Sequence, residues 1–140
     1  MDYNNWKNAY TPCQIGKICQ NFYNDRGSRI YLVPQWCSYD SSKSITIHSG
    51  ESIEWNGSMD VYGDLIVENN ATLTVRCTLS IPPGGKIILH PKATLILDGC
   101  IVTSRCTGSF DGIEIITRKK NKPMIHLMNG AVIQHVKHPL

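Results

Sequence analysis

The stretch Asp64-Leu-Ile-Val-Glu-Asn-Asn-Ala-Thr-Leu-Thr-Val75 decides the fold, because it holds two pairs of alternating apolar residues joined by a polar turn. The pairs are Leu65/Val67 and Leu73/Val75. Short alternating runs of apolar and polar residues are typical of β-strands with one buried face. The residue between them, Asn70, readily adopts positive φ and therefore suits a turn. This stretch predicts two short strands separated by a tight turn.

The same arrangement recurs at fixed offsets through residues 44–136. In the first three units a second apolar pair follows the opening pair by eight residues, and a third pair follows after six more. The openers are Ile45/Ile47, Leu65/Val67, Ile87/Leu89 and Ile113/Ile115; the second pairs are Ile53/Trp55, Leu73/Val75 and Leu95/Leu97; the third pairs are Met59/Val61, Leu79/Ile81 and Ile101/Thr103. Repeats of this period indicate a solenoid, in which each unit buries its apolar face by stacking on the next.

The step sizes distinguish three kinds of solenoid. A leucine-rich repeat needs L-x-x-L-x-L-x-x-N with one strand per unit, and a left-handed hexapeptide helix needs steps of six throughout. Here the steps from residue 45 run eight, six and six. We therefore predict an all-β fold, a right-handed parallel β-helix of about four coils over residues 44–140. Loops are expected at Ser104–Phe110 and Arg118–Pro123, where the spacing lengthens.

Residues 1–43 differ from the rest of the chain. They hold Cys13, Cys19 and Cys37, most of the tyrosines and no repeating pattern. We predict an N-terminal cap, rich in cysteine and aromatic residues, that covers the first coil. At the other end the sequence stops just after a predicted strand. We expect either a longer protein truncated at its C-terminus or self-association at the open last coil.

The composition restricts the class of protein. A hydrophobic fraction of 41% with 18% charged residues is typical of a folded chain. The net charge is +3 and the basic residues are scattered except at Arg118–Lys122, so nucleic-acid binding is not expected. The sequence contains no transmembrane segment and no signal peptide. The even number of cysteines favours disulfides, so we expect a secreted or cell-surface protein whose signal is not present in this sequence.

The amino-acid sequence of three segments resembles that of a family of secreted β-helix surface proteins from Bacteroidetes bacteria. These segments are residues 64–75, Pro82-Pro-Gly-Gly-Lys-Ile-Ile-Leu89 and Lys92-Ala-Thr-Leu-Ile-Leu-Asp-Gly-Cys100. Phe110-Asp-Gly-Ile-Glu-Ile115 and Leu127-Met-Asn-Gly-Ala-Val-Ile-Gln-His135 look like the family's following coil. The resemblance covers residues 44–136. It implies the β-helix fold and an exported destination, and such regions are mostly scaffolds or surface modules.

The positions of the cysteines allow three disulfide arrangements. Cys77 lies at a turn position and Cys100 lies one residue past that position in the next coil, so Cys77–Cys100 is the preferred pair. The alternatives are Cys100–Cys106 across the loop, or Cys106 reaching a cysteine of the cap.

The outward columns contain little catalytic signal. A β-helix enzyme of the pectate-lyase type would need several carboxylates with a base. Instead, Asp64 falls next to Lys86 and Arg76 next to Asp98, which indicates ion pairs between coils. Asp111 and Glu114, close to the Ser104–Phe110 loop, remain the candidate catalytic acids, but no base is tied to them in the sequence.

One further column holds His48, Glu68 and His90. Two imidazoles around a carboxylate could bind a divalent transition metal, whereas the simpler interpretation is a solvent-facing ladder at a turn. No cofactor is expected.

Taken as a sequence, the chain is interpreted as a non-catalytic secreted or cell-surface β-helix scaffold or adhesion module that contacts glycans. The alternatives are a polysaccharide lyase or glycoside hydrolase of the pectate-lyase-like type and a metal-binding module. The expected partners are a polysaccharide or another protein at the open last coil.

Overall fold

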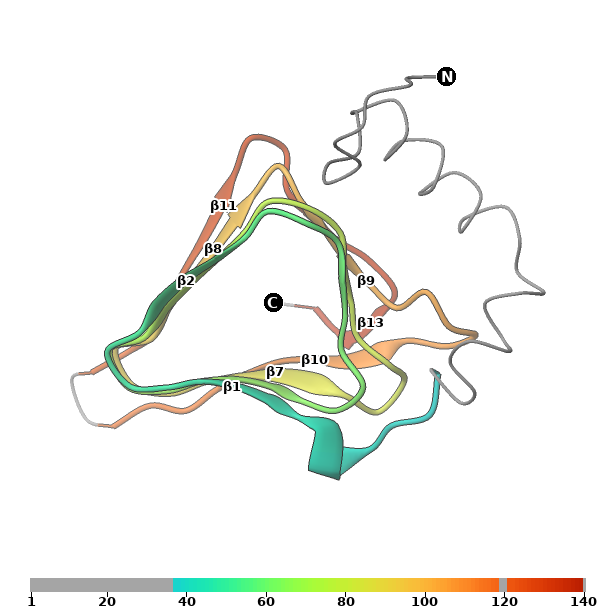
Figure 1. The fold of residues 1–140 in the computed structure, drawn as a ribbon, viewed down its shortest axis with the longest axis horizontal. Helices are drawn as coiled ribbons and strands as arrows, with labels where there is room; N and C mark the ends of the chain where they lie inside the picture. The colour runs from blue at the N-terminus through green and yellow to red at the C-terminus, as the bar shows by residue number, and fades with distance from the viewer. Residues whose placement is uncertain (1–36, 119–120, 140) are drawn as a thin grey trace, which may run out of the picture. The chain divides into compact units, whose positions relative to one another are not determined.

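The computed structural model describes residues 37–118 and 121–139. The chain divides into two units, residues 1–36 and residues 37–140, and all described residues belong to the second (Figure 1). Of the predicted cap, residues 1–36 lie outside the described residues. Within the described residues no helix is long and apolar enough to cross a membrane.

Almost all regular structure in residues 37–118 and 121–139 is strand. The single helix in the described part is a short 3₁₀ turn at Ser41–Lys43. The strands are β1 (Ile45–Ile47), β2 (Ser52–Trp55), β3 (Met59–Asp60), β4 (Leu65–Val67), β5 (Thr72–Val75), β6 (Leu79–Ser80), β7 (Lys86–Leu89), β8 (Thr94–Asp98), β9 (Ile101–Thr103), β10 (Phe110–Ile115), β11 (Met124–Met128), β12 (Val132–Ile133) and β13 (Val136–His138).

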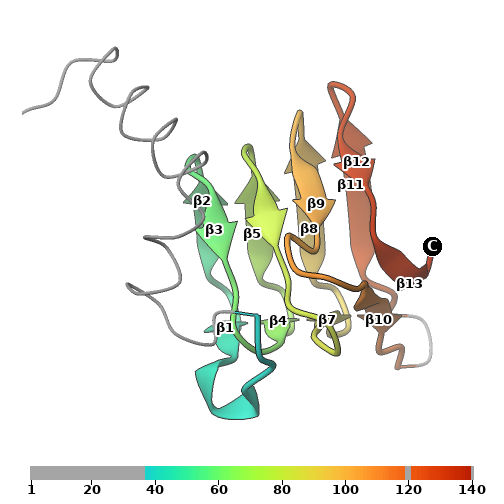
Figure 2. The same ribbon diagram turned by 90° about the vertical axis from the view of Figure 1, so that its right-hand side faces the viewer.

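The strands form three parallel sheets that enclose one core. The first sheet has the order β1-β4-β7-β10-β13, the second β2-β5-β8-β11 and the third β3-β6-β9-β12. Figure 1 looks along the stack from the coil of β1, and the chain turns clockwise as it recedes, which makes the solenoid right-handed. Figure 2 shows the coils side by side. The all-β, right-handed parallel β-helix of about four coils is confirmed.

The registers of the first and second sheets match the predicted columns. Ile45 pairs with Leu65 and Leu65 with Ile87, and the same column continues to Ile113. In the second sheet Leu73 pairs with Leu95. Inward positions are apolar in every coil, so stacking buries a continuous column of aliphatic side chains.

The predicted third column is wrong in one coil. Leu79 pairs with Val102 rather than with Ile101. Val102 is fully buried, whereas Ile101 is 41% exposed. The cause is one extra residue at the preceding turn, where Gly99 adopts φ +60°. The extra residue moves the inward alternation on by one position.

The same shift explains why the predicted disulfide is wrong. Cys100 is turned into the core, Cys77 is half-buried beside the Ser58 hydroxyl, and both are free thiols. Cys106 in the loop after β9 is instead bonded to Cys37, across a sequence separation of 69 residues. This was the open alternative in which Cys106 reaches the cap. Cys13 and Cys19 lie outside the described residues.

Candidate functional site

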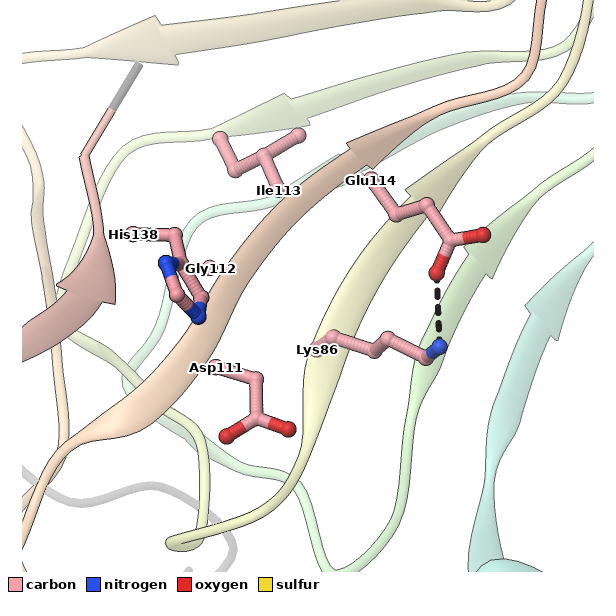
Figure 3. Close-up of a pocket in the computed structure, with 6 residues that line it drawn as sticks. All are labelled: Lys86, Asp111, Gly112, Ile113, Glu114 and His138. Atoms are coloured by element: carbon pink, nitrogen blue, oxygen red, sulfur yellow. Dashed lines mark hydrogen bonds and ion pairs between the residues drawn. The ribbon is translucent and has the colours of Figure 1, made fainter.

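A cleft of about 240 Å³ opens where β7, β10 and β13 lie side by side in the first sheet. Six residues line it: Lys86, Asp111, Gly112, Ile113, Glu114 and His138 (Figure 3). Both candidate acids of the sequence analysis are therefore in one cleft. Figure 3 shows the His138 ring beside Gly112, with Asp111 and the Lys86–Glu114 pair along the neighbouring strands.

One wall of the cleft is an ion pair between strands. The Lys86 ammonium donates a hydrogen bond to the Glu114 carboxylate, with 2.6 Å between Nζ and Oε2. This bond and the charge of Glu114 raise the pKa of Lys86 above its ordinary value. In the register Lys86 lies opposite Gly112, so Glu114 reaches back diagonally from β10.

A second ion pair lies beside the first. The Lys137 ammonium donates to the Asp111 carboxylate at 2.7 Å. The backbone of Asp111 is held by its own N–H, which donates to the carbonyl of Gly85. Asp111 and Glu114 thus each have an ammonium partner, and both side chains are partly exposed.

Asp64 is hydrogen-bonded to Lys86 of the cleft and to Tyr39. The Tyr39 hydroxyl donates to one oxygen of Asp64 at 2.9 Å, and the backbone N–H of Lys86 donates to the other at 3.0 Å. The hydrogen bond to Asp64 raises the pKa of Tyr39. The predicted ion pair between the Asp64 and Lys86 side chains is thus replaced, because the ammonium turns to Glu114. Tyr39 is 41% exposed, and its Cβ lies near the turn at Gly84.

Asp111 and Glu114 are partly exposed, and each carboxylate accepts a hydrogen bond from an ammonium group. The cleft therefore presents positively charged hydrogen-bond donors and negatively charged acceptors side by side. The catalytic roles of Asp111 and Glu114 stay a prediction.

The predicted metal column is assembled only in part. The His48 ring lies 3.6 Å from the Glu68 carboxylate, which also accepts the backbone N–H of Ser49. That backbone hydrogen bond, followed by the charge of His48, lowers the pKa of Glu68. His90 occupies the same turn position one coil beyond Glu68. Its backbone N–H donates a hydrogen bond to the carbonyl of Val67. Among the described residues no group of three His, Cys, Asp or Glu side chains could hold a metal ion.

Sequence reasoning missed two residues of the cleft. His138 belongs to β13, which pairs with the beginning of β10 through Gly112. Its position depends on the length of the turns in the fourth coil, which no motif reveals. The sequence predicted an ion pair between Lys86 and Asp64, whereas the Lys86 ammonium contacts the Glu114 carboxylate. A useful signal was the sequence Phe110-Asp-Gly, because glycine in an otherwise apolar strand often marks a close backbone approach.

The predicted ladder on the second sheet is present and lies away from the cleft. Arg76 lies 3.3 Å from Asp98, as expected, and 3.2 Å from Glu54 in the coil before. The Arg76–Glu54 pair is an exposed ion pair like those at the cleft, so a variant of Glu54 can serve as a control.

No protein-family model, no curated protein and no solved structure matches the chain.

Proposed function

We propose that the protein is a non-catalytic β-helix scaffold or adhesion module that contacts neutral glycans through the cleft around Lys86 and Glu114. The proposal places it outside the cell or on the cell surface, like the Bacteroidetes proteins that the sequence resembles. The Cys37–Cys106 disulfide supports that placement, since such bonds persist mainly in oxidising compartments.

The observation that carries the proposal is the pair of ion pairs beside one small cleft. Each ammonium group is already compensated by a carboxylate, so an anionic polymer gains little there. The hydroxyl groups of a sugar both donate and accept hydrogen bonds, and they match a surface that offers both. The exposed ring of Tyr39 adds an apolar platform with a polar end next to the charged groups.

A polysaccharide lyase or glycoside hydrolase is the second candidate. The specific observation in its favour is that His138 lines the cleft with Asp111 and Glu114, which supplies an imidazole that could act as a base. The two candidates differ in whether bound glycan is cleaved.

The test is a titration of the full chain with neutral and acidic oligosaccharides, with release of reducing or unsaturated ends measured in the same samples. We expect neutral oligosaccharides to bind without turnover. Glu114→Gln should weaken binding roughly tenfold, because it removes a charged hydrogen-bond acceptor. Glu54→Gln, which removes a matched carboxylate from the Arg76 pair, should leave binding unchanged.

If glycan is cleaved and the Asp111→Asn variant no longer cleaves it, the protein is a lyase or hydrolase and the non-catalytic proposal is wrong. Binding only to acidic polymers, or no binding at all, would reject the contact with neutral glycans.

A further inference from the structure

Four places in the chain carry a two-residue sequence that readily closes into a five-membered cyclic imide, a succinimide. In each of them Asn or Asp is followed by Gly, so no side chain hinders the backbone nitrogen that attacks. They are Asn56-Gly57, Asp98-Gly99, Asp111-Gly112 and Asn129-Gly130. The reaction needs a mobile side-chain carbonyl and an unengaged backbone N–H. The hydrogen bonds of the folded chain therefore decide which of the four sites reacts.

Both Asp-Gly sequences are held by the fold. The Asp98 carboxylate lies 3.3 Å from the Arg76 guanidinium, and the Gly99 N–H donates a hydrogen bond to a backbone carbonyl of the next coil. The Asp111 carboxylate accepts from the Lys137 ammonium, and the glycine that follows it is paired within β10 to β7 and β13. A carboxylate is also a poorer target than a carboxamide, because its negative charge repels the incoming nitrogen lone pair.

Asn129-Gly130 is exposed but is fixed in a turn. Asn129 has φ +51° and Gly130 has φ +75°, and the N–H of Ala131 closes the turn by donating to the carbonyl of Met128. The Asn129 carboxamide donates a hydrogen bond to the carboxylate of Asp98 in the preceding coil. Bending the side chain back onto the nitrogen of Gly130 would break this hydrogen bond. The fold therefore protects Asn129.

Asn56-Gly57 has none of these restraints. It lies in the turn between β2 and β3, and both residues are exposed. Backbone hydrogen bonds to the next coil are made at Trp55 and Met59, before and after the turn. Within the described structure neither the Asn56 side chain nor the Gly57 N–H makes a hydrogen bond. Neither residue has positive φ, and a Cβ added at Gly57 would meet nothing within 4 Å.

We propose that Asn56 is a site of spontaneous deamidation in the folded protein and that Asn129 is not. The backbone nitrogen of Gly57 gives up its proton and attacks the side-chain carbonyl carbon of Asn56. A new C–N bond closes the succinimide, the C–N bond of the carboxamide breaks, and its nitrogen leaves with that proton as ammonia. Water then opens the ring at either carbonyl and leaves aspartate or isoaspartate. The inference does not depend on glycan binding.

Both products change the turn in ways that can be measured. Each adds one carboxylate, so the formal net charge of +3 falls by one. Isoaspartate also carries one extra methylene in the main chain between β2 and β3. The two products therefore separate from the unmodified chain by ion exchange, and they separate from one another by methylation with an isoaspartyl methyltransferase.

The test incubates the full chain at mildly alkaline pH, where the backbone nitrogen loses its proton more readily, and follows each site by peptide mapping with mass spectrometry. We expect the acidic products at Asn56 while Asn129 remains an amide. Gly57→Ala should slow the reaction by about tenfold, since steric hindrance that raises the barrier by ~1.4 kcal/mol has that effect. The added methyl group has space and φ is not positive, so this variant should keep its fold.

The matched control is the same chain in concentrated urea. Both Asn-Gly sequences should react there, because unfolding removes the turn and the hydrogen bond that protect Asn129. An unmodified Asn56, equal rates at the two asparagines in the folded chain, or a Gly57→Ala variant that reacts as fast as the unmodified chain would each overturn the proposal. Persistent protection of Asn129 in urea would also overturn it, since the fold could not then be the cause.

Discussion

Gly112 and His138 approach so closely that no side chain fits between them: a Cβ added at Gly112 would lie 2.6 Å from the carbonyl oxygen of His138. Gly112 also has φ +122°, which residues with a side chain rarely adopt. This contact joins β13 to β10 and places His138 at the cleft.

Gly112→Ala should therefore destabilise the protein by about 1–3 kcal/mol and displace β13, through backbone strain and overlap. Urea denaturation measures the loss, and hydrogen exchange of residues 136–138 reports the displacement. Gly57→Ala is the control, because an added Cβ there meets nothing within 4 Å and φ is not positive. Equal stability of the two variants would contradict the close approach.

Truncation of the two leucines of one column should have very different costs. Leu97→Ala should lower the free energy of unfolding by about 2–5 kcal/mol, because it leaves a cavity in the core. Leu127→Ala, in the next coil, should cost less than about 1 kcal/mol in dilute solution, since that side chain is half exposed. Chemical denaturation at low protein concentration compares them, and similar losses would show that the fourth coil is covered.

Loss of the disulfide should destabilise the solenoid. The disulfide joins two cysteines that are 69 residues apart in the sequence. The double variant Cys37→Ser/Cys106→Ser should therefore lower the free energy of unfolding by about 4 kcal/mol, because the unfolded chain regains the entropy of the open loop. Thermal and urea unfolding of the double variant measure the effect. Cys77→Ser, which removes a free thiol, serves as the control and should be nearly neutral. An unchanged midpoint in the double variant would argue against the Cys37–Cys106 bond.

The free thiols should differ in reactivity. Burial raises the pKa of the Cys100 thiol above its ordinary value and also blocks access to it, whereas Cys77 is partly exposed. Iodoacetamide at mildly alkaline pH should therefore modify Cys77 well before Cys100. Peptide mapping by mass spectrometry follows each site separately. Simultaneous modification would mean that the third coil opens on the timescale of labelling.

Glu68 should contribute to the pH dependence of the free energy of unfolding. The Ser49 backbone hydrogen bond lowers its folded-state pKa below the ordinary value of 4.5, so the stabilisation is present above that value. It is lost as the pH falls through the lower, folded-state pKa. Glu68→Gln should therefore be less stable than the unmodified chain near neutral pH, with a difference that shrinks in acid.

Urea titrations over a series of pH values measure this difference. Glu54→Gln removes the same charge from the exposed pair with Arg76 and controls for the change in net charge. A difference between Glu68→Gln and the unmodified chain that stays constant below pH 4.5 would contradict the assignment.

The registers of the first and second sheets followed from local pattern alone. In a parallel solenoid each strand stacks on its equivalent in the next coil, so the spacing of apolar pairs directly predicts which residues meet. That is why the column from Ile45 to Ile113 could be predicted. Positive φ at Gly50 and Asn70 follows equally from the turn chemistry of those residues.

The tertiary structure decided which residues of the third strand in the third coil face the core, because this depends on the conformation of one turn. Gly99 in the left-handed region adds one residue to a turn, and this buries Val102 in place of Ile101 and turns Cys100 into the core. The sequence contains the glycine but does not reveal whether its turn absorbs the extra residue. The predicted disulfide failed for the same reason.

The cleft depended on contacts between residues far apart in the chain. Asp111 and Glu114 were identified from the sequence, but their ammonium partners and His138 were not. Which lysine reaches which carboxylate depends on side-chain directions across neighbouring strands, and His138 arrives only because β13 returns to the first sheet. The sequence by itself determined the repeating wall of the solenoid, and the tertiary structure alone decided which charges meet on it, because repeated local spacing specifies backbone register but not long-range side-chain pairing.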